Sequence, residues 1–201
     1  MIVLTVDQEG SRTVGDRVPE LLAVLADDES ARAAVRPFDR TVGDEVQAVF
    51  ADAAAAVETV LLLMRRGGWS AGIGAGAVDH PLPAQARAGS GEAFVLARQA
   101  VERAKTRSRP VPLAVAGADA ARAAECEAVL TMLGSLARRR TDAGWAAVDT
   151  LRALPDGSQE EVARRLGISQ QAVSQRLRGA QWFEELALRP LAVRLLEEAD
   201  R

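Results

Sequence analysis

The segment Ser158–Arg178, SQEEVARRLGISQQAVSQRLR, has the most specific pattern in the chain, that of two short helices joined by a tight turn. The S-x-x-E pattern from Ser158 to Glu161 is a capping box that begins the first helix. Gly167 stands at the turn, where positive φ is required, and Ser169 caps the second helix. The residues expected to face inward are Val162, Ala163, Leu166, Ile168, Ala172, Val173 and Leu177. A small residue four positions before the turn glycine, with an apolar residue six positions after it, is the spacing of a helix-turn-helix.

The outward side of the second helix is polar, and this composition favours DNA as the partner. Amide and hydroxyl groups pair with base edges, and arginine reaches guanine or phosphate. Between Ser158 and Ala180, four arginines stand against two glutamates, a balance of +2 in a chain of net charge −3. The predicted DNA-binding residues are Arg164, Arg165, Ser169, Gln170, Gln171, Ser174, Gln175, Arg176 and Arg178. The alternative is a helical pair that docks another protein or domain.

Helical patterns flank this motif on both sides. We expect helices over Asp119–Arg140 and Asp142–Leu154, the second one ended by Pro155–Gly157. The last segment, Gln181–Arg201, is also helical, and Pro190 breaks or kinks it. Because DNA readers of this kind commonly bind as dimers, the first and last of these helices are expected to form a homodimer interface. Covering the core of their own domain is an equal alternative.

The first 117 residues alternate between strand and helix signals. The expected strands are Ile2–Val6, Phe38–Val42, Glu45–Phe50, Trp69–Val78 and Val111–Val115. The expected helices are Val18–Leu25, Asp52–Arg66 and Glu92–Lys105. This order predicts a mixed sheet with helices on one face. We place the domain boundary near Gly117, with one domain over residues 1–117 and a helical domain over residues 118–201.

The composition excludes several classes of protein. The chain has 201 residues, 48% of them hydrophobic and 26% charged, which is enough apolar material for a core. The single cysteine, Cys126, and the single histidine, His80, exclude a disulfide framework, a cysteine zinc cluster and paired-histidine metal sites. No apolar run reaches the roughly 18 residues of a membrane span, and the N-terminus lacks a signal-peptide pattern. We therefore expect a soluble, cytoplasmic protein without a membrane partner.

Three segments of the first domain resemble class III nucleotide cyclases. RTVGD at 40–44, followed by VQAVF at 46–50, resembles their hairpin K-x-x-G-D-x-x-x-A-x-F. AGIGAG at 71–76 resembles their strand R-I-G-I-x-x-G, and GEAFVLAR at 91–98 resembles their helix G-x-x-V-N-x-A-x-R. The resemblance implies a ferredoxin-like (cyclase-palm-type) mixed sheet domain for this part of the chain. With the helical pattern that follows, we expect an α+β chain in which this domain precedes an all-α helix-turn-helix domain.

The cyclase resemblance also implies a metal site. In these enzymes two aspartates hold two divalent ions that bind the triphosphate, and Asp7 and Asp44 stand at those positions. No cofactor is required by the residues themselves, and magnesium with a nucleotide is the one that the resemblance implies. Arg40 stands where cyclases carry the base-selecting lysine, and Ser11 and Arg12 are candidate phosphate contacts beside Asp7. The possible ligand-binding residues are therefore Ser11, Arg12 and Arg40.

The last cyclase-like helix departs from the pattern. Val95 replaces the asparagine that orients the ribose, and Arg98 falls one residue early, which is a rotation of about 100° on a helix. A site for in-line displacement requires both groups, so we predict that the chain is not an enzyme and has no catalytic residues. The aspartate pair then either binds a metal-nucleotide as a signal or has a structural, dimerising role.

Nearly the whole chain resembles the SatD family of bacterial proteins, in which an N-terminal domain precedes a C-terminal helix-turn-helix. The residues that carry this resemblance are Asp7, Ser11, Arg12, Asp44, Glu45, Ala97 and Arg98. Together these features predict a sequence-specific DNA-binding protein, a transcriptional regulator whose N-terminal domain dimerises or senses a small nucleotide effector. The alternatives are a divergent magnesium-dependent nucleotidyl cyclase-like enzyme and a protein-docking helix-turn-helix module.

Overall fold

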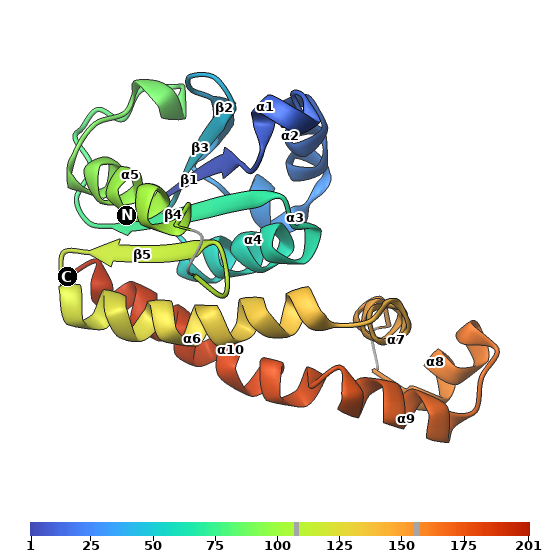
Figure 1. Cartoon of the computed structure of the whole chain (residues 1–201). Helices are drawn as coiled ribbons and strands as arrows, with labels where there is room; N and C mark the ends of the chain where they lie inside the picture. Colours follow the sequence, from blue (N-terminus) through green and yellow to red (C-terminus); the bar gives the residue numbers. More distant parts are fainter. Residues whose placement is uncertain (107–108, 155–156) are drawn as a thin grey trace.

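The computed structural model describes residues 1–106, 109–154 and 157–201, and these form an α+β structure around a mixed five-stranded sheet (Figure 1). The strands are β1 (Ile2–Gln8), β2 (Arg36–Arg40), β3 (Glu45–Phe50), β4 (Trp69–Ala75) and β5 (Leu113–Gly117). Their order in the sheet is β2-β3-β1-β4-β5. Only the β4–β5 pair among them is parallel, and the other three pairs are antiparallel.

Eight of the described helices agree with those expected from the sequence, with their ends shifted by a few residues, whereas the short helices α1, α3 and η1 were not expected. They are α1 (Ser11–Val14), α2 (Val18–Asp27), α3 (Glu29–Arg32), α4 (Ala53–Arg66), the 3-10 helix η1 (Ala86–Ala88), α5 (Glu92–Ala104), α6 (Ala120–Arg139), α7 (Asp142–Arg152), α8 (Gln159–Leu166), α9 (Gln170–Gly179) and α10 (Trp182–Ala199). The side chains of Asp52 and Asp119 accept hydrogen bonds from the first turns of α4 and α6. The expected stop at Pro155–Gly157 involves positions 155 and 156, which lie outside the described residues.

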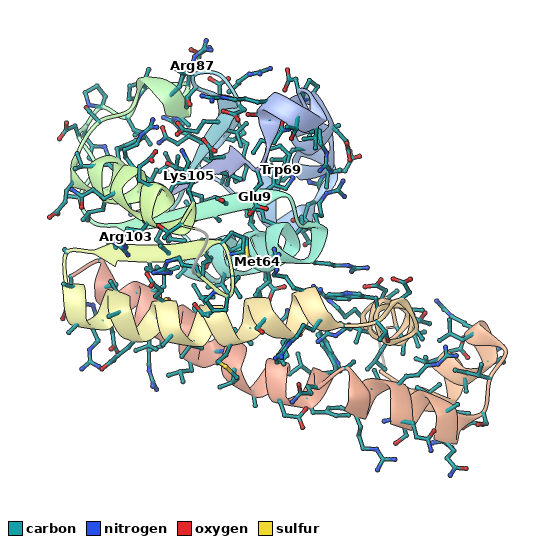
Figure 2. The ribbon with its side chains drawn as sticks, in the orientation of Figure 1. Glu9, Met64, Trp69, Arg87, Arg103 and Lys105 are labelled. Atoms are coloured by element: carbon teal, nitrogen blue, oxygen red, sulfur yellow. The ribbon has the colours of Figure 1, made fainter. Side chains whose placement is uncertain are left out.

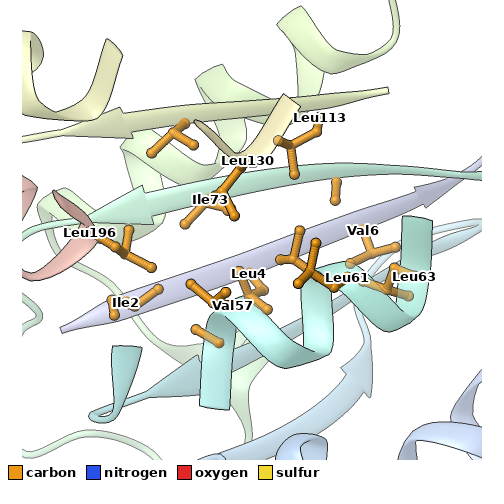
Figure 3. Packing of buried hydrophobic residues seen from close by; sticks show 14 of the residues in the cluster. Ile2, Leu4, Val6, Val57, Leu61, Leu63, Ile73, Leu113, Leu130 and Leu196 are labelled. Carbon is orange, nitrogen blue, oxygen red and sulfur yellow. The ribbon is translucent and has the colours of Figure 1, made fainter. Parts of the chain in front are cut away.

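Helices cover both faces of the sheet, so the expectation of helices on one face is wrong. Along β1, Ile2, Leu4 and Val6 pack in the cluster that contains residues of α4, α6 and α10 (Figure 3). Alternate residues face the other way, and Val3 packs with Ala97 of α5. The second face of the middle strands is mixed: Val3 and Val49 are apolar and buried, and the buried Gln47 donates to Thr5 at 2.9 Å.

Two glycines of β4 allow α5 to lie directly on the sheet. A Cβ atom at Gly72 would lie 2.2 Å from the backbone nitrogen of Val101, and one at Gly74 would lie 2.1 Å from the carbonyl oxygen of Ala93. Backbone atoms cannot move aside for a methyl group, so these positions require glycine. The glycine pattern of this segment therefore serves close strand–helix packing.

Helices α6 and α10 run side by side in opposite directions beneath the sheet (Figure 1). Arg122 and Glu198 meet at one end of the pair, and the Sγ of Cys126 donates to the carbonyl of Ala192 near its middle. Burial raises the pKa of Cys126 to about 12, which is consistent with an inert core residue. Pro190 lies inside α10, which continues to Ala199, so the expected break does not occur.

A second hydrophobic cluster joins α7, α8, α9 and the start of α10, and we call α7–α9 the trihelical unit. Its buried residues are Ala147, Val148, Val162, Ala163, Val173, Leu177, Ala180 and Trp182. The sheet cluster, in contrast, includes residues of α6 and α10 that follow Gly117 in the sequence, Leu130 and Leu196 among them. The C-terminal half of the chain thus contributes to both clusters.

A network of arginine, glutamate and tryptophan side chains connects the trihelical unit to the rest of the molecule. Arg140 and Glu185 form an ion pair with almost no solvent exposure, 0% and 2% for their side chains. Arg140 also donates to the carbonyl of Ala180 at 2.8 Å, and its guanidinium lies 4.2 Å from the ring centre of Trp145. A separate ion pair of 2.6 Å joins Arg65 of α4 to the trihelical unit through Asp149. This junction fixes the unit against α4 and α10.

In the parts of the chain that the structure describes, no helix is long and apolar enough to cross a membrane.

Candidate functional site

The turn between α8 and α9 has the local geometry that the sequence predicts. Ser158 and Ser169 each accept a hydrogen bond from the backbone three residues later, at 3.4 and 3.2 Å. Gly167 ends α8 with φ of 64°, a left-handed conformation that favours glycine. The backbone nitrogen of Ile168 donates to the carbonyl of Ala163 at 3.0 Å, which closes the turn.

The inner faces of the two helices fix their relative orientation. Val162, Val173 and Leu177 have no solvent exposure, and Ala163 is 7% exposed. These side chains pack against Ala147 and other residues of α7. The outer face of α9 is therefore presented by a packed three-helix support.

The predicted base-contacting residues gather on the outside of α9. Those classed as exposed are Ser169, Gln170, Gln171, Gln175 and Arg178, and those that are half-buried are Ser174 and Arg176. Residues 170, 171, 174, 175 and 178 follow helical spacing, so they share one side of the helix. A row of amides and one hydroxyl, ended by an arginine, can donate to and accept from the base edges of a DNA groove.

The two arginines of α8 are held by a glutamate rather than standing free. Glu161 accepts from both Arg164 and Arg165, which lowers the pKa of Glu161, with the hydrogen bond from Arg164 as the larger cause. Its carboxylate is thus engaged with these arginines. Of the two bonds of the expected capping box, the one from the backbone nitrogen of Glu161 to Ser158 forms. The side chains of Arg164 and Arg165 remain 78% and 51% exposed. Because exposed ion pairs contribute only about 0–1 kcal/mol, phosphate can compete for these arginines.

At the end of β1, Asp7 is bound to the only lysine of the sequence. The Nζ of Lys105 lies 2.9 Å from the carboxylates of both Asp7 and Glu102. Burial raises the pKa of Asp7 in spite of Lys105, and the negative charge of Asp44 adds to the rise. Burial acts to lower the pKa of Lys105, but hydrogen bonds to Glu102 and Asp7 outweigh it and raise the pKa. The backbone nitrogen of Gln8 donates to the carbonyl of Asp44 at 3.3 Å, so Asp44 lies beside the end of β1.

The hairpin residue Glu45 is buried and meets Arg98 of α5. Arg98 donates to both carboxylate oxygens of Glu45, one of them at 2.8 Å, and Thr41 donates to the same group at 2.6 Å. Glu45 and Arg98 are among the residues that resemble the SatD family, but the sequence does not predict that they contact each other. A glutamate on a strand and an arginine on a distant helix carry no sequence signal of pairing.

The possible ligand-binding residues Ser11, Arg12 and Arg40 lie on two different elements. Ser11 and Arg12 belong to α1, a single turn that follows β1. Arg40 lies at the end of β2, where it donates to Asp16 at 2.8 Å and to the carbonyl of Gly43 at 2.6 Å. The hydrogen bond from Arg40 lowers the pKa of Asp16. Arg40 therefore stabilises the hairpin and the segment before α2.

The cyclase resemblance implies a pair of divalent ions at Asp7 and Asp44, and the surroundings of Asp7 bear on this expectation. Within residues 1–106, 109–154 and 157–201, no group of three or more His, Cys, Asp or Glu side chains is arranged to hold a metal ion. In addition, the Lys105 ammonium already occupies the Asp7 carboxylate, where it would repel a cation. We derive no chemical step from a metal at this position.

A cavity of about 610 Å³ opens beside Asp7 and was not foreseen from the sequence. Its charged lining residues are Asp7, Glu9, Lys105, Arg109 and Arg138, and Figure 2 labels Glu9 and Lys105 among them. Two of its cations are already paired, Lys105 with Asp7 and Arg109 with Glu127. The cavity therefore lacks the excess of free positive charge that would mark a phosphate site.

Comparisons of this chain with protein-family models, curated proteins and solved structures find no match. The function is therefore inferred from the geometry of α8 and α9 and of the polar end of the sheet.

Proposed function

We propose that the chain is a sequence-specific DNA-binding protein, a transcriptional regulator that reads DNA with the outer face of α9. The observation that carries this proposal is the row of exposed amides along α9, on a helix whose start is capped and whose inner face is fully packed. A rigid helix with outward amides and arginines matches direct readout in the major groove.

The composition of this face supports DNA over a docked protein. The centre of a protein interface is depleted of charge and rich in aromatic or apolar side chains, whereas the outer face of α9 has glutamine, serine and arginine. The local balance of +2 from Ser158 to Ala180 also attracts phosphate, although the whole chain has a net charge of −3. These two features separate the proposal from the protein-docking alternative.

The strand order supports the ferredoxin-like part of the proposal. Strands β1, β3 and β4 are adjacent and antiparallel, and β2 lies beyond β3. Helices α2 and α3 connect β1 to β2, and α4 connects β3 to β4, which is the split βαβ arrangement of ferredoxin-like folds. This topology is compatible with the resemblances to class III cyclases and to the SatD family.

We further propose that the sheet has a structural role and no cyclase activity. Two cyclase-like side chains are already bound to other residues of the chain. Asp7 pairs with Lys105, and Arg98 pairs with Glu45. Val95, at the position of the ribose-orienting asparagine, is 57% exposed and offers no hydrogen bond.

The test is selection from a random double-stranded DNA library with the full chain, followed by binding titrations of the enriched sequence. Gln171→Ala and Gln175→Ala should each change the preferred base at one position, at a cost of about 1–3 kcal/mol there. Arg164→Ala should weaken binding to all sequences alike and reduce the salt slope by about 1. Gln99→Ala, an exposed glutamine on α5, is the matched control and should change nothing.

Three outcomes would contradict the proposal. Selection that enriches no motif, together with a stable co-purifying protein, would favour the docking module. Equal preference in wild type, Gln171→Ala and Gln175→Ala would remove α9 as the reading helix. Magnesium-dependent turnover of ATP or GTP that Asp44→Asn abolishes would favour the divergent enzyme.

A further inference from the structure

The outer side of the α6–α10 pair, which faces away from the sheet, has an apolar groove. The groove has a volume of about 640 Å³ and lies between the two helices. Ala128 and Val129 line it from α6, and Leu191 and Leu195 line it from α10. Met132 continues the same face of α6, four residues after Ala128, and its side chain is 55% exposed. Ala128 and Met132 of α6 thus stay in contact with water, Val129 and Leu191 are half-buried, and Leu195 is buried beneath them.

The outer edge of β5 is less suited than a helical surface to the association of two copies. The backbone groups of Val115 on this edge already bind side chains: Glu127 accepts from its nitrogen at 2.8 Å, and Arg103 donates to its carbonyl at 2.6 Å. Backbone groups bound in this way do not pair with another strand. This favours a helical surface for self-association.

The charged rim of the groove permits the approach of a second copy of the same chain. Arg122 pairs with Glu125 at 2.6 Å and with Glu198 at 3.3 Å, and Arg194 lies 3.8 Å from Glu198, so two positive charges balance two negative ones within the chain. A rim of one sign would repel its own copy, whereas this balanced rim lets two copies meet around a two-fold axis without repulsion. A strongly basic or acidic partner would gain no net electrostatic attraction from this rim.

The face is also large enough for a dimer. Helices of 20 and 18 residues are each about 30 Å long. Since each helix is about 10 Å wide with its side chains, two helices side by side present a flat area of roughly 600 Å². This is of the same order as the about 800 Å² that each partner buries in a stable interface.

We infer that the α6–α10 groove is the homodimer interface, with Met132 near its centre. The inference deepens the proposed function and rests on it, because a two-fold dimer would offer two α9 helices to half-sites about 34 Å apart. The polar outer face of α9 and the apolar groove would then have separate tasks, DNA reading and self-association.

The experiment is sedimentation velocity on the full chain without DNA, over a range of micromolar concentrations. The wild type should have twice the chain mass of 21.3 kDa. Met132→Glu and Ala128→Glu each place a charge on the surface that the dimer would bury in both copies. Each should raise the dimer dissociation constant at least tenfold. Val95→Glu introduces the same charge on α5, at a position of similar exposure, 57%, and should leave the dimer intact. Circular dichroism checks that all variants keep their helices.

A wild type that is monomeric throughout, or a dimer that neither variant weakens, would overturn the inference. Failure of the inference and failure of the proposed function are distinguishable. Sedimentation measures self-association without DNA, whereas the selection and titrations measure DNA binding. A dimer broken by Met132→Glu without any enriched DNA motif would keep the interface and discard the function. A monomer that enriches a single half-site would do the reverse.

Discussion

The outer face of α9 and the polar end of the sheet around Asp7 both have side chains that the sequence marks for binding, but they present them differently. On α9, Gln171 and Gln175 are exposed on a helix supported from behind. At the sheet, Asp7 is bound to Lys105 and the buried Glu45 is bound to Arg98. The first region can exchange water for a ligand, whereas the second would first have to break its own ion pairs.

The difference explains why motif resemblance and geometry point to different parts of the chain. The cyclase-like pattern includes Asp7 and Arg98. In the fold these two side chains form ion pairs with Lys105 and Glu45. A buried carboxylate that already has its cation contributes to the structure without being available to a ligand. The helix-turn-helix pattern concerns local geometry, which does not depend on distant partners.

The largest effect is expected at the junction between the two regions. Glu185→Ala leaves the Arg140 guanidinium without its carboxylate in a place that solvent does not reach. Loss of one partner of a buried ion pair costs about 3–5 kcal/mol, so the free energy of unfolding in urea should fall by this amount. Glu184→Ala, at the exposed neighbouring position, is the control and should stay within about 0.5 kcal/mol of wild type. A loss below about 1 kcal/mol for Glu185→Ala would mean that water reaches the Arg140–Glu185 pair and that the pair contributes little to holding the trihelical unit in place.

A matched pair of glycine substitutions compares the packing of the two regions directly. Gly72→Ala forces a methyl group against the backbone of α5 and should reduce stability by about 1–3 kcal/mol. Gly179→Ala, at the end of α9, meets open space and should raise stability by about 0.5–1 kcal/mol, because alanine favours the helix. Thermal unfolding of both variants measures the contrast. Equal shifts of the same sign would contradict a tightly packed sheet beside an open helix end.

The smallest effect concerns the charge of Asp7. Its pKa is raised above 3.8, chiefly by burial, so folding favours the protonated form and the ionised form costs stability at neutral pH. Asp7→Asn removes this cost, and we expect a gain on the order of 0.5 kcal/mol at pH 7. The gain should appear as the pH rises through the raised pKa and vanish below pH 3.8, where both side chains are neutral.

Urea unfolding at several pH values measures this gain, with Asp27→Asn as an exposed control. A loss of stability at pH 7 would show that the ion pair with Lys105 outweighs burial. That result would also sharpen the contrast with α9, since it would make the end of the sheet a more strongly self-bound region.

Much of the candidate site was predictable from the sequence because its signals are local. Ser158, Gly167 and Ser169 mark two helix starts and a turn, and each acts on backbone within four residues of itself. The apolar spacing of Val162, Val173 and Leu177 follows from helical geometry in the same way. The end of the sheet was less predictable, since its contacts join β1 and the hairpin to α5.

By itself, the sequence determined the strands and the longer helices, the turn geometry at Gly167 and the polar face of α9, because caps, glycines and periodicity act over a few neighbouring residues. Only the tertiary structure decided that α5 covers the second face of the sheet, that Glu45 meets Arg98 and that Arg140 meets Glu185. With 25 basic and 28 acidic residues in the chain, very many pairings are compatible with the composition. The order of the strands and the crossing of the helices select among them, because ion pairs require their atoms to lie within about 4 Å.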